Sequence, residues 1–350
     1  MYIIHSKYLF VKLKIPYKYL MLKYCSQPWN YVNIWSSGEV RLCLCPSWTT
    51  NGPIGILNSE TSLETIFSSA RSTQFRNSIV DQSFKNCSSH CSNLWNLESK
   101  SNLDQLPVPK LPTNLHLHLD LNCNLKCASC RNTNIYSPTV NPKTKEILDI
   151  LTEEYQDHKE TVFIYGDGIG DMFTSAAYQQ FLRNDRLPKC FKFCITTNGN
   201  LLTKNLDILK KLHDQNQIDL IIVSFDAATN DTYKNVRGGN FELLTEGIEQ
   251  VVNLGIKVSA QYVTQYKNYL EILDYVALCK RLRVSHIGLQ KITRWPHMND
   301  DWWLANNLDN NPTVDYEFLI SALKTIDLDP QCGIDGGLKN LLYPLQIKQN

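Results

Sequence analysis

Neither sign of charge is in excess in this sequence. Its 35 Lys and Arg residues and 34 Asp and Glu residues leave a formal net charge of +1 over 350 residues. Nucleic acids and acidic membranes bind strongly basic surfaces, so neither is expected as a partner. The sequence also lacks tandem repeats and low-complexity tracts, which excludes a repeat array. Its length suffices for one large domain and a small one.

Long apolar runs and a recognisable secretory signal are also missing. Residues 1–22 are apolar and aromatic, but repeated lysines interrupt them, so they lack the continuous run of a membrane-spanning helix. Residues 1–24 could form an extra strand or a weak membrane-surface contact. Alternatively, the start is mis-called, because Met21 lies just before the first informative motif. We expect a cytoplasmic protein.

Cysteine, by contrast, is abundant, with twelve residues. In a small secreted domain this number would indicate disulfide bonds. Here the cysteines cluster at short spacings and no secretory signal precedes them. Metal binding is therefore the better interpretation.

Composition divides the chain into successive regions. Residues 25–102 form a cysteine-rich α+β module, and residues 103–114 contain three prolines, which predicts an extended linker between two folding units. Residues 115–295 alternate predicted strands and helices. Residues 296–350 are a C-terminal extension.

Six short runs rich in Ile, Val, Phe and Leu predict buried parallel strands in the third region. They are 115–121, 161–166, 191–197, 218–225, 256–264 and 285–290. Helices are predicted at 142–157, 173–184, 203–214, 241–254 and 269–282, with Thr203 and Asn268 as N-caps. This order predicts an α/β fold with right-handed crossovers. Six units are too few for a closed eightfold barrel, so we expect an open, partial (β/α)6 barrel with its chemistry at the carboxyl ends of the strands.

Three cysteines directly follow the first predicted strand. Cys123, Cys127 and Cys130 lie in the segment Asp120-Leu-Asn-Cys-Asn-Leu-Lys-Cys-Ala-Ser-Cys-Arg131. Three thiolates on one loop can hold three irons of a 4Fe–4S cluster, which leaves the fourth iron open for catalysis. A structural zinc site would need a fourth ligand. His116 and His118 are near in sequence, but they share one strand face that points away from the loop. Zinc and coincidental core cysteines remain alternatives.

These residues resemble the signature of the radical S-adenosylmethionine (radical SAM) superfamily, over roughly residues 115–295. The resemblance implies that the methionine moiety of the cofactor chelates the open iron. It implies further that one electron from the cluster cleaves the sulfonium, and that the resulting 5′-deoxyadenosyl radical abstracts a substrate hydrogen. The residue before the third cysteine is usually aromatic in this family and packs near the adenine. Here it is Ser129, so adenine contacts must come from elsewhere.

Later segments match further family motifs in order. Tyr165-Gly-Asp-Gly-Ile-Gly-Asp171 resembles the glycine-rich segment that hydrogen-bonds the methionine amino group. The third strand ends in Thr196-Thr-Asn-Gly-Asn200, and the fourth in Val223-Ser-Phe-Asp-Ala227, followed by Tyr233 and Arg237-Gly-Gly239. Each match alone could be a tight loop or a polar strand end.

The resemblance assigns roles to individual residues. Ser224 resembles the ribose contact, and Arg237 resembles the arginine whose planar guanidinium meets the methionine carboxylate. Asp226 could contact the ribose or the substrate. The predicted cofactor-binding residues are Gly166, Gly168, Asp171, Thr197, Asn198, Ser224, Asp226 and Arg237. The last strand, Ile287–Arg294, lies where the family contacts adenine, so Gln290 and Lys291 are candidates for the active-site face, unless they only form a solvated strand end.

A second cysteine set lies in the N-terminal module. Cys25, Gly38 and Cys43 have the spacing Cys-x12-Gly-x4-Cys, and Cys87 and Cys91 complete four predicted ligands. Apolar residues flanking Ser36-Ser-Gly38 predict a hairpin whose open end holds Cys25 and Cys43.

The spacing of this set resembles the shortened auxiliary-cluster module of the SPASM/twitch type, although that module usually follows the radical domain. The resemblance implies a second 4Fe–4S cluster. A tetrathiolate zinc ribbon is the main alternative, because both sites use the same residues. Cys45 is either a fifth ligand or a packed thiol. Cys190, Cys194 and Cys279 are predicted core residues, and Cys332 could lie near the active site.

The sequence thus predicts a radical SAM enzyme, an oxidoreductase with S-adenosyl-L-methionine and two 4Fe–4S clusters. A peptide or protein is the expected substrate by analogy. The alternatives are radical modification of a sugar or other small molecule and a catalytically inactive zinc-binding interaction protein. The expected partners are the substrate and an electron donor such as flavodoxin or ferredoxin.

Overall fold

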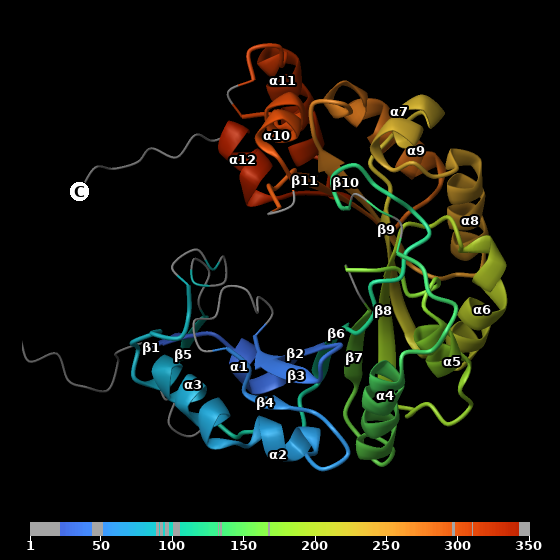
Figure 1. Ribbon diagram of the computed structural model, residues 1–350. Coiled ribbons are helices and arrows are strands. Elements are labelled where there is room, and N and C mark those ends of the chain that lie inside the picture. Colours follow the sequence, from blue (N-terminus) through green and yellow to red (C-terminus); the bar gives the residue numbers. More distant parts are fainter. Residues whose placement is uncertain are drawn as a thin grey trace, which may run out of the picture.

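The computed structural model describes residues 22–43, 52–88, 91, 94, 98–100, 106–131, 133, 135–166, 169–295, 298–309 and 311–342. Within these residues a ten-stranded sheet has the order β12-β11-β10-β9-β8-β7-β6-β2-β3-β4. The sheet curves, with the N-terminal module at one end of the arc and the C-terminal helices at the other (Figure 1).

Six parallel strands form the centre of the sheet. They are β6 (Asn114–His118), β7 (Val162–Gly166), β8 (Phe191–Thr197), β9 (Ile218–Ser224), β10 (Val258–Thr264) and β11 (His286–Lys291). All six predicted strands are confirmed, as is the open partial barrel. The first strand ends at His118, three residues earlier than predicted, because the chain turns there into the cysteine loop.

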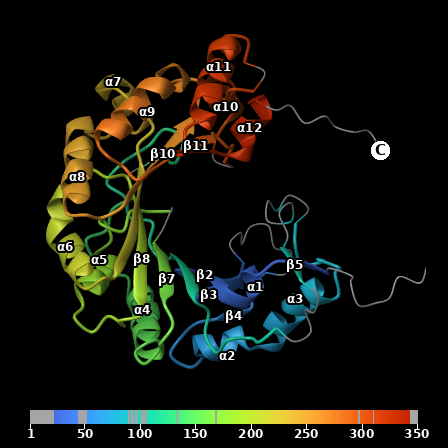
Figure 2. The same ribbon diagram turned by 180° about the vertical axis from the view of Figure 1, so that it is seen from behind.

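The connecting helices cover the outer face of this sheet (Figure 2). They are α4 (Pro142–Glu154), α5 (Ala176–Arg183), α6 (Leu206–Asp214), α7 (Asn230–Val236), α8 (Phe241–Asn253) and α9 (Ile272–Arg281). Helix α7 was not predicted, since its seven residues carry little apolar periodicity. The apolar strand residues facing these helices belong to one continuous core.

Of the two predicted N-caps, Thr203 is wrong, whereas Asn268 takes the N-cap position without capping through its side chain. Thr203 is the first residue of the 3-10 helix η4 (Thr203–Asn205), which precedes α6, and no side chain caps this helix. Asn268 precedes η5 (Tyr269–Glu271), but its side-chain oxygen accepts the amide of Gln265 instead. Its Nδ2 donates to the carbonyls of Asp226 and Val263, at 3.0 Å each. The side chain therefore ties the ends of β9 and β10 together and is not available to cap a helix.

The N-terminal module continues the same sheet. Strand β2 (Tyr31–Trp35) pairs with β6 in parallel register, from Tyr31 opposite Asn114 to Trp35 opposite His118. The predicted hairpin of β2 and β3 (Glu39–Leu42) is confirmed, and β4 (Gly55–Ile56) follows it. Gly38 closes the turn at φ +86°, where a Cβ would lie 2.5 Å from a carbonyl oxygen. The module and the barrel therefore share backbone hydrogen bonds.

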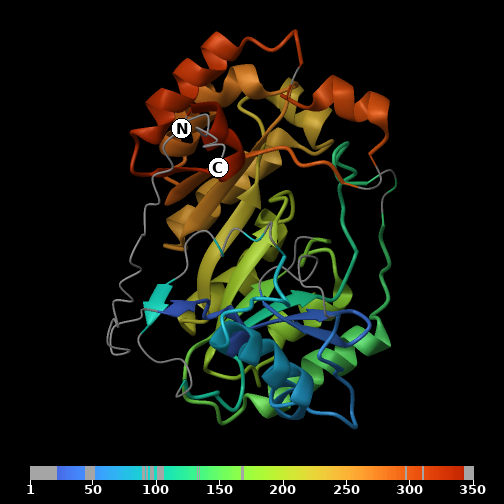
Figure 3. The same ribbon diagram turned by 90° about the vertical axis from the view of Figure 1, so that its left-hand side faces the viewer.

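The rest of the described chain lies at the two ends of the arc (Figure 3). The module adds α1 (Gln27–Asn30), α2 (Leu63–Phe67), α3 (Ala70–Val80) and a two-stranded sheet of β1 (Leu22–Tyr24) and β5 (Glu98–Lys100). The C-terminal end adds α10 (Asp300–Asn306), α11 (Tyr316–Asp327), β12 (Cys332–Ile334) and α12 (Gly336–Leu342). No helix among the described residues is long and apolar enough to cross a membrane.

Candidate active site and metal centres

The cysteine loop after β6 is held by hydrogen bonds around Asn122. The Asn122 side chain accepts the Ser137 amide at 2.7 Å, and its carbonyl accepts the Asp171 amide at 2.7 Å. Cys123 forms an isolated antiparallel β-bridge with Ile135, where the chain returns past the loop. Cys123 and Cys127 are buried, whereas Cys130 is exposed. The loop is thus fixed on both sides, with one thiol toward solvent.

One cavity unites most of the predicted site. Eight predicted residues line it, namely Cys123, Cys127, Cys130, Asp171, Thr197, Asn198, Ser224 and Arg237. Four lining residues were missed, namely Leu125, Arg131, Gly170 and Thr196. Gly170 could have been found as the third glycine of its segment. A Cβ at Gly170 would lie 2.3 Å from the Asp120 carbonyl oxygen, so the close approach to the cysteine loop requires glycine.

Asp171 is a buried carboxylate that joins two strand ends. Its Oδ2 accepts the Thr197 hydroxyl and the Asn198 amide, both at 2.8 Å, and its Oδ1 accepts the Phe173 amide at 3.0 Å. Burial raises the pKa of Asp171, and these hydrogen bonds oppose that rise. Because both oxygens are engaged, Asp171 orders the segment after β7 against the end of β8.

Arg237 and Asp226 form a buried ion pair beside the cysteine loop. Arg237 Nε lies 2.7 Å from Asp226 Oδ2, though not aligned as a hydrogen bond, and Nη1 donates to Cys127 Sγ at 3.5 Å. Burial alone would lower the pKa of Arg237. The charges of Asp226 and Cys127 outweigh burial, so the pKa is raised and the guanidinium stays charged. Asp226 holds φ +60°, and Val263 donates its amide to the Asp226 carboxylate.

Each cysteine of the loop has a polar neighbour. Asn198 Nδ2 lies 3.7 Å from Cys123 Sγ, and Arg237 approaches Cys127 as described. Arg131 is hydrogen-bonded to Cys130, while its guanidinium donates to the carbonyls of Leu121 and Ile169. Donors of this kind stabilise thiolates and set the properties of an iron–sulfur cluster.

Other predicted residues do not line the cavity. Gly166 packs under Met172, whose Sδ would lie 1.7 Å from an added Cβ, so this glycine serves packing. Lys291 forms an ion pair with Asp309 at 2.7 Å, and Gln290 is exposed. Gly168 lies outside the described residues.

In the N-terminal module the structure brings three predicted ligands together. Burial, together with the nearby Cys25 and Cys91, raises the pKa of the Cys87 thiol to about 12. Cys43 is buried at the open end of the β2–β3 hairpin. Cys45 lies outside the described residues.

The remaining predicted cysteines lie elsewhere in the barrel. Cys194 and Cys279 are buried, Cys190 is half-buried, and Cys332 starts the edge strand β12. His116 and His118 share one strand face, as expected, and their hydrogen bonds go to Tyr31 and Asn33 of β2.

Two known protein families match the segments that contain these two sets of cysteines. Residues 121–279 match the radical SAM superfamily. The chain therefore contains a radical SAM domain. Residues 25–92 match SPASM, an iron–sulfur cluster-binding domain. The radical SAM match covers the cavity-lining residues described above.

Individual relatives are more distant. A probable GTP 3',8-cyclase of Methanococcus aeolicus is 26% identical over 181 residues, covering 49% of this chain and 56% of that protein. Its counterpart in Methanococcus vannielii is 27% identical over 194 residues, covering 49% and 61%. The chain thus spans less than two thirds of these relatives.

Solved structures show a similar distance. Streptococcus suis SuiB bound to S-adenosylmethionine has a TM-score of 0.48 at 17% identity, covering 67% of this chain and 52% of that one. Native anSMEcpe with bound AdoMet has a TM-score of 0.46 at 14% identity, covering 61% and 59%.

A radical SAM domain has a 4Fe–4S cluster and S-adenosyl-L-methionine as cofactors, and a SPASM domain has an auxiliary iron–sulfur cluster. The residues present fit the first cluster, since three thiols with nearby donors line one cavity. Among the described residues, no group of three or more His, Cys, Asp or Glu side chains is arranged so that it could hold a single metal ion. A cubane needs no such arrangement, because each thiolate binds a different iron.

Proposed function

We infer that this chain cleaves S-adenosyl-L-methionine reductively and abstracts a hydrogen from a peptide or protein substrate. The observation that carries this proposal is the cavity at the carboxyl ends of β6 to β9, where the three loop cysteines meet polar residues from neighbouring strands. In a parallel α/β barrel this edge carries the chemistry. The bound cluster would supply the electron that cleaves the cofactor to a 5′-deoxyadenosyl radical.

The chain's own residues would hold the reactants in place. Cys123, Cys127 and Cys130 would ligate three irons, with Asn198 and Arg237 donating toward two of the sulfurs. Ser224 lines the cavity at the end of β9 and would contact the ribose. Arg237 has a charge that suits the methionine carboxylate, and Asp226 fixes its orientation.

Spectroscopy of anaerobically reconstituted protein tests this cofactor site. We expect absorbance near 400 nm and an electron paramagnetic resonance signal of the reduced cluster that changes when S-adenosyl-L-methionine is added. The change would report binding at an iron without a protein ligand. A reconstituted sample with zinc in place of iron would instead support the zinc-binding interaction protein.

The substrate class needs a separate experiment. A peptide is supported by analogy, because proteins with an auxiliary module of this type often modify peptides or proteins. A nucleotide is the second candidate, since both curated relatives are named as probable GTP 3',8-cyclases. Deuterium transfer into 5′-deoxyadenosine from a deuterated peptide would support the first. Transfer from deuterated GTP would support the second.

A further inference from the structure

Cys43 has an unusual backbone conformation. Its φ is +82°, in the left-handed region that residues other than glycine rarely adopt. Its amide donates to the Tyr31 carbonyl at 3.2 Å, and the Asn33 side chain donates to the Cys43 carbonyl. The residue is 7% exposed. Hydrogen bonds on both sides therefore hold this cysteine in a conformation it would not otherwise prefer.

Asn33 connects Cys43 to the catalytic half of the sheet. Its side chain is fully buried on β2, and its Oδ1 lies 3.0 Å from His118 Nε2 on β6. Because Nδ2 of Asn33 donates to Cys43, Oδ1 must accept, so His118 donates through Nε2–H. Both side chains are buried, and loss of either partner would leave a buried polar group without its hydrogen bond.

His118 in turn is close to the catalytic cysteines along the chain. It is the last residue of β6, and its carbonyl accepts the Ser36 amide at 3.0 Å. Two residues later, Asp120 accepts hydrogen bonds from Asn122 and Ser175, just before Cys123. A continuous set of hydrogen bonds and short chain segments thus runs from Cys43 to the catalytic loop.

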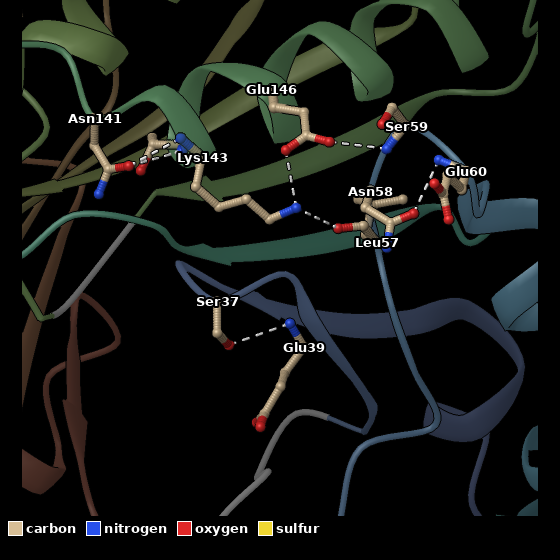
Figure 4. Close-up of polar contacts among 10 residues, drawn as sticks. Ser37, Glu39, Leu57, Asn58, Ser59, Glu60, Asn141, Lys143 and Glu146 are labelled. Carbon is tan, nitrogen blue, oxygen red and sulfur yellow. Dashed lines mark hydrogen bonds and ion pairs between the residues drawn. The ribbon is translucent and has the colours of Figure 1, made fainter.

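A second set of contacts fixes the module from the other side of the sheet. Lys143 of α4 donates to the Leu57 carbonyl at 3.1 Å, and Glu146 accepts the Ser59 amide at 2.8 Å (Figure 4). These contacts place the module on α4 independently of β2. A change at Asn33 or His118 should therefore act locally and leave the module attached.

We propose that Asn33 and His118 are positioning residues that hold Cys43 in the conformation in which it presents its thiol to the auxiliary cluster. This rests on the proposed radical SAM function and on the predicted role of Cys43 as a ligand of the auxiliary cluster, in the segment that matches SPASM. Through His118, the position of that ligand is set by β6, the strand that leads into Cys123. The geometry of the second site is thereby coupled to the first.

The experiment compares four hydrogen-bonding variants, with Cys43→Ala as the reference for loss of the ligand. Asn33→Leu and His118→Phe remove the hydrogen bonds, and phenylalanine keeps the ring that stacks on Trp35 at 4.5 Å. His118→Gln is the conservative variant, because its amide can donate where Nε2 does. His116→Phe is the matched control on the same strand face, since the His116 ring is hydrogen-bonded to Tyr31 and not to Asn33.

Two readouts are measured for each variant. The first is the alkylation rate of Cys43 in the metal-free protein, followed by mass spectrometry. The buried Cys279 serves as an internal control for global unfolding. The second is the iron content after reconstitution.

The two disruptive variants, Asn33→Leu and His118→Phe, should change both readouts. We expect Cys43 to be alkylated about tenfold faster, because one buried hydrogen bond is lost. We expect the iron content to fall roughly twofold, because one of the two 4Fe–4S clusters is lost. His118→Gln and His116→Phe should resemble the wild type.

Two outcomes would overturn the proposal. One is an unchanged Cys43 reactivity in both disruptive variants. The other is faster alkylation with full iron content in these variants, while Cys43→Ala loses iron. Full iron content in Cys43→Ala itself would contradict the predicted ligand role of Cys43, and the positioning role toward a cluster would fail with it.

Discussion

Arg237 is buried beside a carboxylate and a thiol of the catalytic loop, so its removal has two separable effects. Arg237→Ala should weaken S-adenosyl-L-methionine binding by on the order of 1.5–3 kcal/mol, the value of one charge-assisted contact. It should also lower the free energy of unfolding by about 3–5 kcal/mol, because Asp226 would remain buried without its partner. Calorimetry and urea denaturation measure the two effects.

The double variant Asp226→Asn with Arg237→Ala separates these effects. Asparagine keeps the oxygen that accepts the Val263 amide but removes the charge. Stability should therefore largely return while cofactor binding stays weak. Recovery of binding together with stability would mean that Arg237 acts only as a structural ion pair.

Cys194 illustrates a pH effect at a single residue. Burial, with a smaller contribution from nearby Asp219, raises the pKa of this thiol to about 12. The folded-state pKa lies above the unfolded value of about 9, so the thiol contributes stability below pH 9 that is lost as pH rises toward 12. Between pH 8 and pH 10, apo protein should lose about 1 kcal/mol more stability than Cys194→Ala. Equal losses in urea denaturation would show that Cys194 titrates normally.

At the scale of elements, the strands were predictable because buried parallel strands are continuous apolar runs. The pairing of β2 with β6 was not, since a hairpin signal reports only local antiparallel contacts and about eighty residues separate the two strands. Asn268 stands at the predicted N-cap position, but its side chain bonds to neighbouring strand ends, which no local pattern reveals. The cysteine spacing was enough to identify the cluster loop. The pairing of Arg237 with Asp226 was not predictable, because it depends on the left-handed backbone of Asp226 just after β9.

Helix α2 depends on a residue of another element. Glu154 of α4 accepts the backbone amides of Leu63 at 2.7 Å and Glu64 at 3.3 Å, at the start of α2. Glu154→Ala should destabilise this contact by about 1–2 kcal/mol, as for loss of a helix cap. Hydrogen exchange of residues 63–67 should then be faster. Glu153→Ala, an exposed neighbour, is the control and should leave the exchange unchanged.

At the scale of the whole molecule, the two cysteine sites belong to one sheet. Joint replacement of Cys25, Cys43, Cys87 and Cys91 by Ala should halve the iron of reconstituted protein. The catalytic cluster should survive, because the backbone pairing of β2 with β6 and the α4 contacts need no cysteine. Uncoupled cleavage of S-adenosyl-L-methionine should persist while product formation falls.

Metal analysis checks this prediction. Zinc in place of iron, in protein made anaerobically with ample iron and sulfide, would make the module a structural ribbon. Cys45→Ser should keep the full iron content if Cys45 is only a packed thiol.

The central claim is that Cys123, Cys127 and Cys130 hold the cluster that cleaves S-adenosyl-L-methionine. The most direct measurement is 5′-deoxyadenosine production by reduced, reconstituted protein, compared between the wild type and the triple alanine variant. The account predicts production by the wild type and none above background by the variant, whose auxiliary iron should remain. Undiminished production by the triple variant would contradict the claim.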